Sequence, residues 1–475
     1  MQGKKFYQEK LFIQFQLSDY IPQDNFYKKL KDIIDFDFLY TLTSKYYGSQ
    51  GQKSIDPVVF MKLMLVGYLE NLNSDRRIIS TSRMRMDILY FIGYDLDEEL
   101  PWHSTLSRTR QLYGEEVFTS IFKCILKQCV ERGLVSGKKQ AVDSVFVKAN
   151  ASLTSMVEKE VLDDALVYTQ ELINNEEEVP IRKLPLKDRK VKRSNKTHIS
   201  PADPDSRMSV KPGKVTRLNY LAQVSVDTRK HVITHIQAFQ SDKGDAYCLP
   251  ELVHHVHNNL KETGLQLREI LADNGYSSGK ALKFLSENNI IAYIPNSGKY
   301  KFNRDGFTYD KSNDSYICSQ GKLLTFRHFR TDSHNTYKIY KTSVKDCKNC
   351  PLKGNCANSV GVKALEDTIS KHLYDEMHLR MKTLKGIKMR KLRSSTVEPV
   401  IGTLVNFTAM SKVLTKGIKL ANKCMVMAAV AYNLKKLVLT NKTPLQKLRP
   451  KIITYLKGIT DFLREWLFNH TAYIL

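Results

Sequence analysis

The sequence contains no long hydrophobic run. A membrane-spanning helix needs about 20 mostly apolar residues, and the longest candidate, residues 424–432, is about half that length and is flanked by polar residues. No apolar signal-peptide core follows the N-terminal Met1-Gln2-Gly3. We therefore expect a cytoplasmic protein with no membrane partner, in which the 8 cysteines are reduced.

Acidic residues are scarce relative to basic ones. The chain has 49 Asp and Glu residues against 74 Lys and Arg residues, a formal net charge of +25. Such an excess destabilises a compact state by self-repulsion, which a bound polyanion would relieve. Nucleic acid is the polyanion that this balance favours. An anionic membrane surface is the competing partner, but no basic amphipathic anchor accompanies the charge.

The length of 475 residues predicts two or three domains. Apolar residues at helical spacing predict an all-α domain over residues 1–135. Short β-branched segments that alternate with helical ones predict an α/β domain from 136–300, with a charged insertion at about 151–214. A Cys-rich insert at 301–366, a helical segment at 367–445 and a helical tail at 446–475 complete the prediction.

Two acids stand in or directly after predicted strands. Asp143 lies within the β-branched run 141–147, and Asp273 ends the strand-like run 269–273 just before an Asn-Gly turn. A carboxylate in an apolar strand is costly unless it is paired, hydrogen-bonded or bound to a metal. Each acid is therefore either part of a catalytic site or a structural residue that caps the following turn.

Four segments resemble, in the same order, those of the DDE transposases of bacterial insertion sequences. They contain Val142-Asp143-Ser144, Asp203-Pro204-Asp205, Ala272-Asp273-Asn274-Gly275 and Thr396-Val397-Glu398-Pro399, and residues 432–437 resemble the end of the last helix of the family. The resemblance implies an RNase H-like catalytic domain, a mixed sheet with flanking helices, behind an all-α DNA-binding domain. It also implies double-stranded DNA as partner (transposon ends and target), a homodimer and a nucleoid-associated location.

The resemblance assigns the catalytic roles to Asp143, Asp273 and Glu398, which would hold two Mg²⁺ (or Mn²⁺) ions. Mg²⁺ prefers a few hard oxygen ligands from the protein and leaves positions for phosphate and water. Two ions stabilise the attacking and leaving oxygens of an in-line displacement. Water would first free a 3′-hydroxyl at the transposon end, and this hydroxyl would then attack the target phosphodiester.

Glu398 also has a structural interpretation. Ser395 and Glu398 have the spacing of a capping box, but Pro399 would then fall where a helix needs a backbone donor. We therefore expect the helix to begin nearer Glu398. The chain departs from the family after Glu398, because the next basic residues are only at Lys412 and Lys416. Asp203 and Asp205 are interpreted, with Arg207, as local turn and ion-pair structure.

Four cysteines fall in the insert, at Cys318, Cys347, Cys350 and Cys356. Cys347 and Cys350 have the C-x₂-C spacing of half a structural zinc site, so one interpretation is a tetrahedral Cys₄ site for Zn²⁺. The other is a small loop module with reduced cysteines.

Three regions are candidates for DNA contact. One is the basic run 182–196 of the charged insertion, and the other two contain the basic and hydroxyl residues named below. A solvated polar surface is the alternative interpretation. The candidates are Arg76, Arg77, Arg83, Ser104, Ser107, Arg108 and Arg110 in the first region, and Lys388, Arg390, Lys391, Arg393, Lys412 and Lys416 in the second. The main expectation, a DNA transposase, has three rivals: a non-catalytic DNA-binding protein derived from such an enzyme, a metal-dependent nuclease without strand transfer, and a zinc-dependent structural adaptor.

Overall fold

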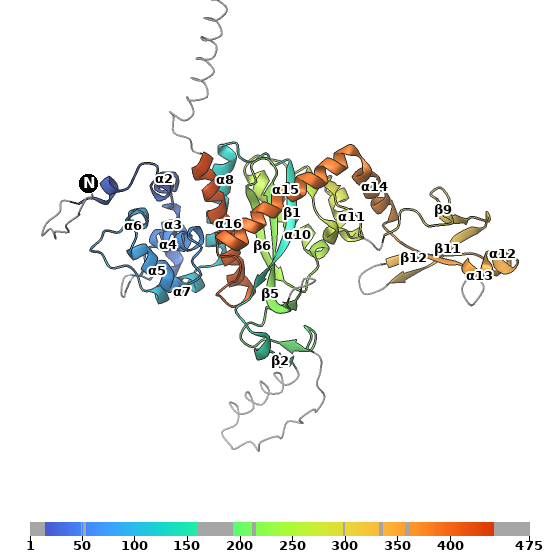
Figure 1. Ribbon diagram of the computed structural model, residues 1–475, viewed down its shortest axis with the longest axis horizontal. Coiled ribbons are helices and arrows are strands. Elements are labelled where there is room, and N and C mark those ends of the chain that lie inside the picture. The colour runs from blue at the N-terminus through green and yellow to red at the C-terminus, as the bar shows by residue number, and fades with distance from the viewer. Residues whose placement is uncertain are drawn as a thin grey trace, which may run out of the picture.

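The computed structural model describes residues 15–48, 50, 54–159, 193–210, 215–297, 300–331, 336–356 and 362–440. Within these ranges the chain forms an N-terminal group of helices, a central sheet with helices on both faces, and a second sheet at the far end of the molecule (Figure 1). The predicted tail at 446–475 and most of the charged insertion lie outside the described residues.

The first region is helical, as predicted. Its elements are α1 (Leu17–Tyr20), α2 (Phe26–Ile33), α3 (Phe38–Thr43), η1 (Ser44–Tyr46), α4 (Pro57–Leu69), α5 (Asp75–Arg83), α6 (Met86–Ile92), α7 (His103–Leu112) and α8 (Glu115–Glu131). At the start of α4, the Asp56 carboxylate accepts hydrogen bonds from the Val58 and Val59 backbone N–H groups at 2.7 and 3.1 Å. Pro57 occupies the first turn, where no backbone donor is needed.

The central sheet is mixed. Its strands are β1 (Lys139–Lys148), β4 (Arg207–Ser209), β5 (Arg217–Asp227), β6 (Ile233–Gln240), β7 (Glu269–Leu271) and β8 (Ile291–Tyr293). The order is β4-β5-β1-β7-β8, and β6 also pairs with β5. Strand β5 is antiparallel to β1, β4 and β6, whereas β7 is parallel to β1 and to β8. A two-stranded sheet, β2 (Val157–Glu158) and β3 (His198–Ile199), follows η2 (Leu153–Ser155).

Helices cover the two faces of this sheet. On one face, α10 (Asp245–Glu262) contacts β5 and β6, and α11 (Gly279–Glu287) follows the short η3 (Asn274–Tyr276). On the other lie α15 (Leu384–Phe407) and α16 (Ile418–Thr440), which are preceded by α14 (Lys371–Lys382). Because both faces are covered, every residue of β5 after Arg217 is buried.

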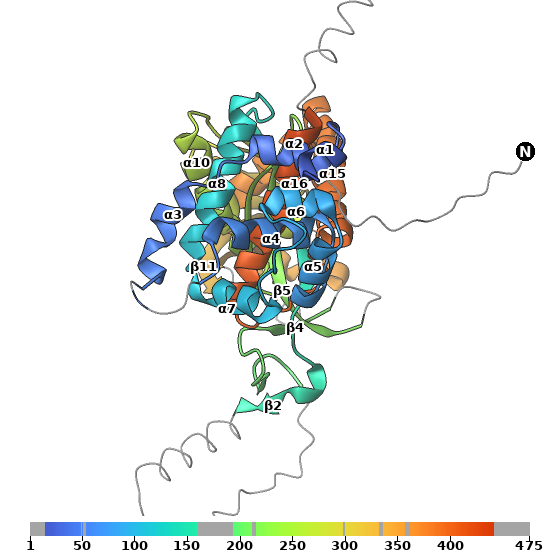
Figure 2. The ribbon, with the colours of Figure 1, turned by 90° about the vertical axis from the view of Figure 1, so that its left-hand side faces the viewer.

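Helix α16 joins the N-terminal helices to the sheet. It packs against α4 and α8 as well as β6, so a single hydrophobic core runs from Leu17 to Val438 (Figure 2). The buried Lys423 ammonium donates to the Tyr113 carbonyl at 2.5 Å and to the Arg110 carbonyl at 3.2 Å. The Asn433 amide bonds both backbone groups of Ile233 at 2.9 Å. The helices of the first region are thereby fixed against the sheet.

Asp203 and Asp205, interpreted from the sequence as local turn structure, also contact residues far away along the chain. Asp203 accepts from the Tyr220 hydroxyl at 2.5 Å and from the Gly417 N–H at 3.0 Å, and Asp205 accepts from the Ile418 N–H at 2.9 Å. Both carboxylates therefore stabilise the N-terminus of α16, where anions are favoured. The predicted ion pair with Arg207 is wrong, because Arg207 pairs with Asp242 at 3.5 Å.

The second sheet is antiparallel and projects from the body of the molecule (Figure 1). Its strands, in the order β13-β12-β11-β10-β9, are β9 (Phe307–Asp310), β10 (Ser315–Cys318), β11 (Leu323–Thr331), β12 (Thr336–Lys341) and β13 (Ala364–Thr368), with the short helices α12 (Val344–Lys348) and α13 (Lys353–Cys356). Among the described residues of this sheet, a small cluster of buried side chains packs together, formed by Tyr316, Leu324, Tyr340 and Leu365. The predicted small Cys-rich insert is thus a sheet in its own right.

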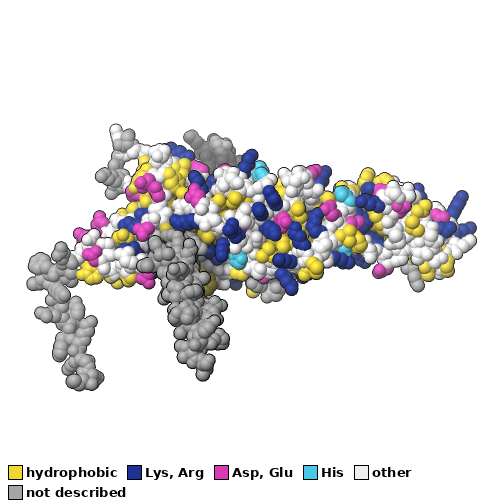
Figure 3. Space-filling model, turned by 90° about the horizontal axis from the view of Figure 1, so that it is seen from above, with side chains coloured by type: hydrophobic (Ala, Val, Ile, Leu, Met, Phe, Trp, Pro, Cys, Tyr) yellow, Lys and Arg dark blue, Asp and Glu magenta, His cyan; other side chains and the backbone are white. Residues whose placement is uncertain are grey.

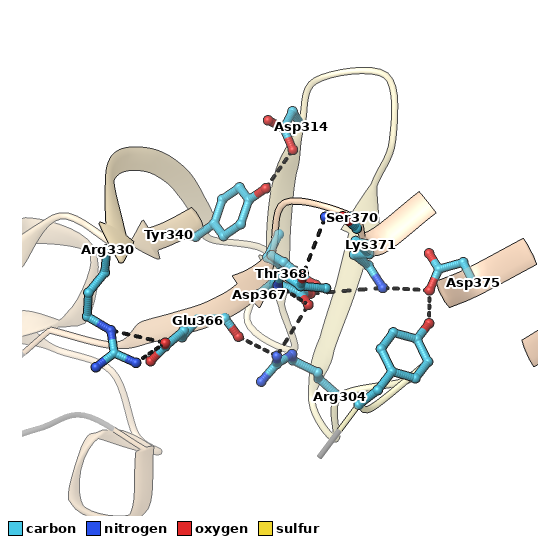
Figure 4. A network of polar contacts seen from close by, with 12 residues as sticks. Arg304, Asp314, Arg330, Tyr340, Glu366, Asp367, Thr368, Ser370, Lys371 and Asp375 are labelled. Atoms are coloured by element: carbon cyan, nitrogen blue, oxygen red, sulfur yellow. Dashed lines mark hydrogen bonds and ion pairs between the residues drawn. The ribbon is translucent and has the colours of Figure 1, made fainter. Parts of the chain in front are cut away.

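Polar contacts connect the second sheet to α14 (Figure 4). Asp367, at the end of β13, lies 3.7 Å from the Arg304 guanidinium and 3.9 Å from the Lys371 ammonium. The same ammonium pairs with Asp375 on α14 at 2.9 Å. Among the described helices, none has the length and apolar content that a bilayer crossing requires.

Candidate active site

Asp143 lies in the middle of the central sheet, on the face that α15 covers. Strand β1 pairs with β5 along most of its length, with Asp143 opposite Val224. The Asp143 carboxylate accepts the backbone N–H of Ser144 at 2.8 Å and is 20% exposed. The predicted strand position is therefore confirmed, and the side chain points from the sheet toward a helix.

Asp273 follows β7, the strand parallel to β1. Its carboxylate accepts the Gly275 backbone N–H at 2.8 Å and so caps the turn at η3. The backbone at Gly275 lies close to both carboxylates, since a Cβ there would lie 3.0 Å from an Asp273 oxygen and 3.1 Å from an Asp245 oxygen. The capping interpretation of Asp273 and a catalytic role are compatible, since the second carboxylate oxygen makes no part of this cap.

Glu398 lies on α15, and its side chain is 55% exposed. The prediction that a helix starts near Glu398 is wrong, because α15 begins at Leu384 and runs through Pro399. Proline removes one backbone donor, but Ser395 and Pro399 are both exposed, so water can serve the unpaired carbonyl. The capping box is also excluded, since the Ser395 hydroxyl donates to the Leu392 carbonyl within the helix.

Arg393 brings two of the acids together. One guanidinium nitrogen lies 2.9 Å from an Asp143 oxygen, and the other terminal nitrogen lies 2.9 Å from a Glu398 oxygen. The Arg393 side chain is only 14% exposed. Predicted as a DNA contact, Arg393 is instead bound within the site and connects β1 to α15.

The pKa of Asp143 reflects the charges and the burial around its carboxylate. Burial raises the pKa of Asp143, and the nearby Asp273 raises it further, while the Ser144 N–H and the Arg393 guanidinium oppose the shift. Carboxylates that disfavour one another's charge are the donor set that a divalent cation stabilises. In the described residues no three His, Cys, Asp or Glu side chains are grouped as a metal site, and Arg393 supplies the positive charge.

A buried chain of hydrogen bonds that lies beside Asp273 was not predicted from the sequence. The Tyr276 hydroxyl donates to the Gln223 side-chain carbonyl, and the Gln223 amide donates to an Asp245 oxygen at 2.7 Å. The chain ties η3 and the start of α10 to β5, beside Asp273. A glutamine inside an apolar strand was the available signal, because a buried amide needs partners.

The other candidates for DNA contact have different surroundings. Arg76, Arg77 and Arg83 on α5, Arg108 on α7, and Lys388, Arg390 and Lys391 on α15 are exposed, as is Lys416, whereas Ser104, Ser107 and Lys412 are partly buried. Arg110 is 8% exposed and pairs with Asp75 at 2.6 Å, so its guanidinium is held by this acid and not presented at the surface. Seen from above, Lys and Arg side chains gather over the middle of the molecule (Figure 3).

The four insert cysteines make separate contacts. The Cys318 sulfur, on β10, accepts the Lys322 N–H at 3.3 Å, whereas the Cys347 sulfur, on α12, lies 3.1 Å from the Thr342 hydroxyl. Cys350 and Cys356 are partly buried. All four are described residues and none belongs to a metal-binding group of three, so the structure does not support the predicted Zn²⁺ site.

Two family models match the chain. One described as a transposase domain (DUF772) matches residues 15–112, and one described as a transposase DDE domain matches residues 317–438. Both matches are to transposase models, and together they support a DDE transposase. The DDE match contains Glu398 and ends within α16, whereas the DUF772 match covers most of the N-terminal helices. Asp143 and Asp273 lie between the two matches, so their roles rest on geometry and on the resemblance described above.

Solved structures give only distant likenesses. The piggyBac transposase synaptic complex with hairpin DNA is 12% identical, with 94% of this chain and 80% of that chain covered and a TM-score of 0.32. The Mos1 transposase paired-end complex with the left transposon end is 8% identical, with 54% and 64% covered and a TM-score of 0.16. Both likenesses are too distant to bear on the fold. No curated protein matches the sequence.

Proposed function

We propose that this transposase cleaves DNA at the ends of an insertion sequence and joins the ends to target DNA, with Asp143, Asp273 and Glu398 as the catalytic acids. The observation that carries the proposal is the meeting of Asp143 and Glu398, from β1 and α15, on one guanidinium beside Asp273. The proposed site would draw its acids from three separate elements, two of which already meet on Arg393.

The sheet supports an RNase H-like catalytic domain. Strands β6, β5 and β1 are antiparallel neighbours, and β7 and β8 continue the sheet parallel to β1. This order places Asp143 on the central strand and Asp273 just beyond the carboxyl end of the adjacent parallel strand. Such strand ends are where mixed and parallel sheets place functional residues.

The three carboxylates would hold two divalent ions, with Mg²⁺ or Mn²⁺ matching their hard oxygen donors. When bound, such ions stabilise the attacking and leaving oxygens of phosphodiester displacement. Asp143 and Asp273 are fixed by backbone hydrogen bonds from Ser144 and Gly275, so their orientation is set before substrate binds. Glu398 is the more exposed ligand and closes the site from the helix side.

The DNA path would run along α15. Lys391 precedes Glu398 by two helical turns, about 10 Å along the axis, and like Lys388 and Arg390 it is exposed. Phosphates bound by these side chains would lie beside the acids. The exposed arginines of α5 and α7 would contact a more distant part of the duplex, consistent with a net charge of +25. A homodimer on paired ends, in the nucleoid, belongs to the same proposal.

The test uses the purified full chain, Mg²⁺ and labelled DNA that carries the element's own ends. Cleaved ends and joined products should form with the wild-type protein, and Asp273→Asn should reduce both by at least about 10³-fold, because a ligand of both displacement steps is lost. Asp97→Asn, at an exposed position away from the site, is the matched control.

Two outcomes would favour the rivals. Cleavage without any joined product would indicate a nuclease that lacks strand transfer. Specific binding of the ends without cleavage, by wild type and variant alike, would indicate a DNA-binding protein derived from a transposase. Activity that survives Asp273→Asn would show that the acids are wrongly assigned.

A further inference from the structure

Arg393 occupies the space between two of the proposed metal ligands. Its guanidinium pairs at 2.9 Å with Asp143 and at 2.9 Å with Glu398, and little of its side chain reaches solvent. A divalent ion shared by these two carboxylates would need the same oxygens. The guanidinium and the ion therefore compete for one place, and this competition follows from the proposed function.

Helix geometry shows that Arg393 is directed at the sheet and not at solvent. Residues five apart on an α-helix differ by about 140° around its axis, so Arg393 and Glu398 do not lie on one stripe. Lys391, seven residues before Glu398, does lie on that stripe, and it is exposed. Arg393, and not Lys391, faces β1 and contacts Asp143 there. Its side chain must cross the surface of the helix to reach Glu398.

We propose that Arg393 blocks the acid site in the free protein and leaves it when DNA binds. A DNA phosphate beside α15 offers the guanidinium an alternative anion, and the arginine fork pairs with phosphate as well as with carboxylate. Moving Arg393 from the acids to a phosphate frees Asp143 and Glu398 together. Divalent-ion loading is thereby coupled to DNA binding.

The coupling has a thermodynamic consequence. Because Arg393 and the ion bind the same carboxylates, the affinity of the free protein for the ion is reduced by the stability of the Arg393 contacts. DNA that draws Arg393 away restores that affinity, and by reciprocity the ion strengthens DNA binding by the same factor. A permanently structural Arg393 would show neither effect.

The experiment measures Mn²⁺ binding to the full-length protein by calorimetry, with and without a duplex that carries the element's end. Without DNA, Arg393→Gln should bind Mn²⁺ about tenfold more tightly than wild type, a coupling within the usual range. DNA should tighten Mn²⁺ binding by wild type about tenfold and by Arg393→Gln hardly at all. Arg132→Gln, at an exposed position outside the proposed DNA contacts, controls for the general loss of positive charge and should retain the response to DNA.

Arg393→Lys provides a second variant if the glutamine variant does not fold. An ammonium lacks the two-sided fork, so it should hold the acids less well and give an intermediate affinity for Mn²⁺. Equal or weaker Mn²⁺ binding by both variants in the absence of DNA would overturn the inference, as would a wild-type affinity that DNA leaves unchanged.

Failure of the inference is distinguishable from failure of the proposed function. Asp273→Asn does not touch the Arg393 contacts, and it should weaken Mn²⁺ binding in both the wild-type and the Arg393→Gln background. If it does so while Arg393→Gln behaves as wild type, the acids bind metal and only the blocking role of Arg393 is wrong. If Asp273→Asn changes Mn²⁺ binding in neither background, the proposed active site itself is wrong.

Discussion

The two larger sheets of the described chain have six and five strands, but their surroundings are opposite. Strand β5 of the six-stranded sheet is buried at every position after Arg217, whereas β11 of the five-stranded sheet is exposed at every position except Leu324. The first sheet belongs to a core that extends into the N-terminal helices, and the second has a core of four residues.

This difference explains where a catalytic site can form. Burial of the Asp143 carboxylate is unfavourable, and the large core around it stabilises a fold that contains it. The same packing prevents the acid from moving, which keeps its geometry fixed. The second sheet also buries a carboxylate, that of Asp367, but Arg304 and Lys371 surround it with positive charge at the junction with α14 (Figure 4). The Arg330–Glu366 pair of this sheet is exposed. We therefore expect chemistry in the first sheet and surface contacts in the second.

The largest expected difference in stability is between one apolar residue in each sheet. Leu271, on β7, has no exposed surface, so Leu271→Ala should lower the free energy of unfolding by about 2–5 kcal/mol through lost burial and a cavity. Phe329, on β11, is 57% exposed, and Phe329→Ala should cost less than about 1 kcal/mol. Urea unfolding followed by circular dichroism measures both. Equal losses would mean that the second sheet is packed more tightly than its exposure indicates.

A smaller difference is expected for one hydroxyl group in each sheet. Tyr276→Phe removes the donor to the buried Gln223 carbonyl and should cost about 1–3 kcal/mol, because that acceptor loses its partner. Tyr309→Phe removes a bond to Asp314, which keeps Tyr340 and Lys338 as donors, so its cost should be below about 1 kcal/mol. Thermal unfolding of the two variants against wild type makes the comparison. A harmless Tyr276→Phe would show that the buried polar chain does not stabilise the site.

The local sequence pattern predicts the strands and helices that carry the site. The surroundings of Arg110 and Arg393 depend on tertiary contacts, which the local pattern does not show. The strand that contains Asp143 is visible as a β-branched run, the strand before Asp273 as a short apolar run, and α4 from its Asp-Pro start. The burial of Arg110 depends on Asp75, which lies on another helix. The position of Arg393 depends on a contact with β1, so no nearby residue could indicate it.

Two further misses have local physical reasons. Pro399 predicts that the helix starts near Glu398, but the helix continues through this proline. The exposed Ser395 carbonyl, one turn earlier, can bond water in place of the missing backbone N–H. In the insert, the C-x₂-C spacing favours a zinc site. The same insert contains strands with aromatic and β-branched residues, and these pair into a sheet. Spacing of ligand-type residues alone does not show that their side chains converge.

The smallest effect that we predict comes from comparing the pKa of an acid in the second sheet, Asp310, with the pKa of Asp143. Burial raises the pKa of Asp143 in the folded state above its usual 3.8. Its ionisation therefore lowers the stability of the folded state as the pH rises from 3.8 through the raised pKa. Asp310 is the last residue of β9, and hydrogen bonds from Ser312 and then Asn313 lower its pKa to about 2. Its contribution to stability is therefore complete above its usual pKa of 3.8 and is lost as the pH falls through about 2.

Ser312→Ala removes the largest cause of that shift and should move the pKa of Asp310 toward its usual value, with almost no change in stability at pH 7 because the site is solvated. NMR titration of the labelled aspartate carboxyl carbons measures the pKa. Asn313→Ala should give a smaller change in the same direction. If neither substitution moves the pKa of Asp310, local hydrogen bonds do not set its ionisation, and the contrast with the buried carboxylate of Asp143 would need a different cause.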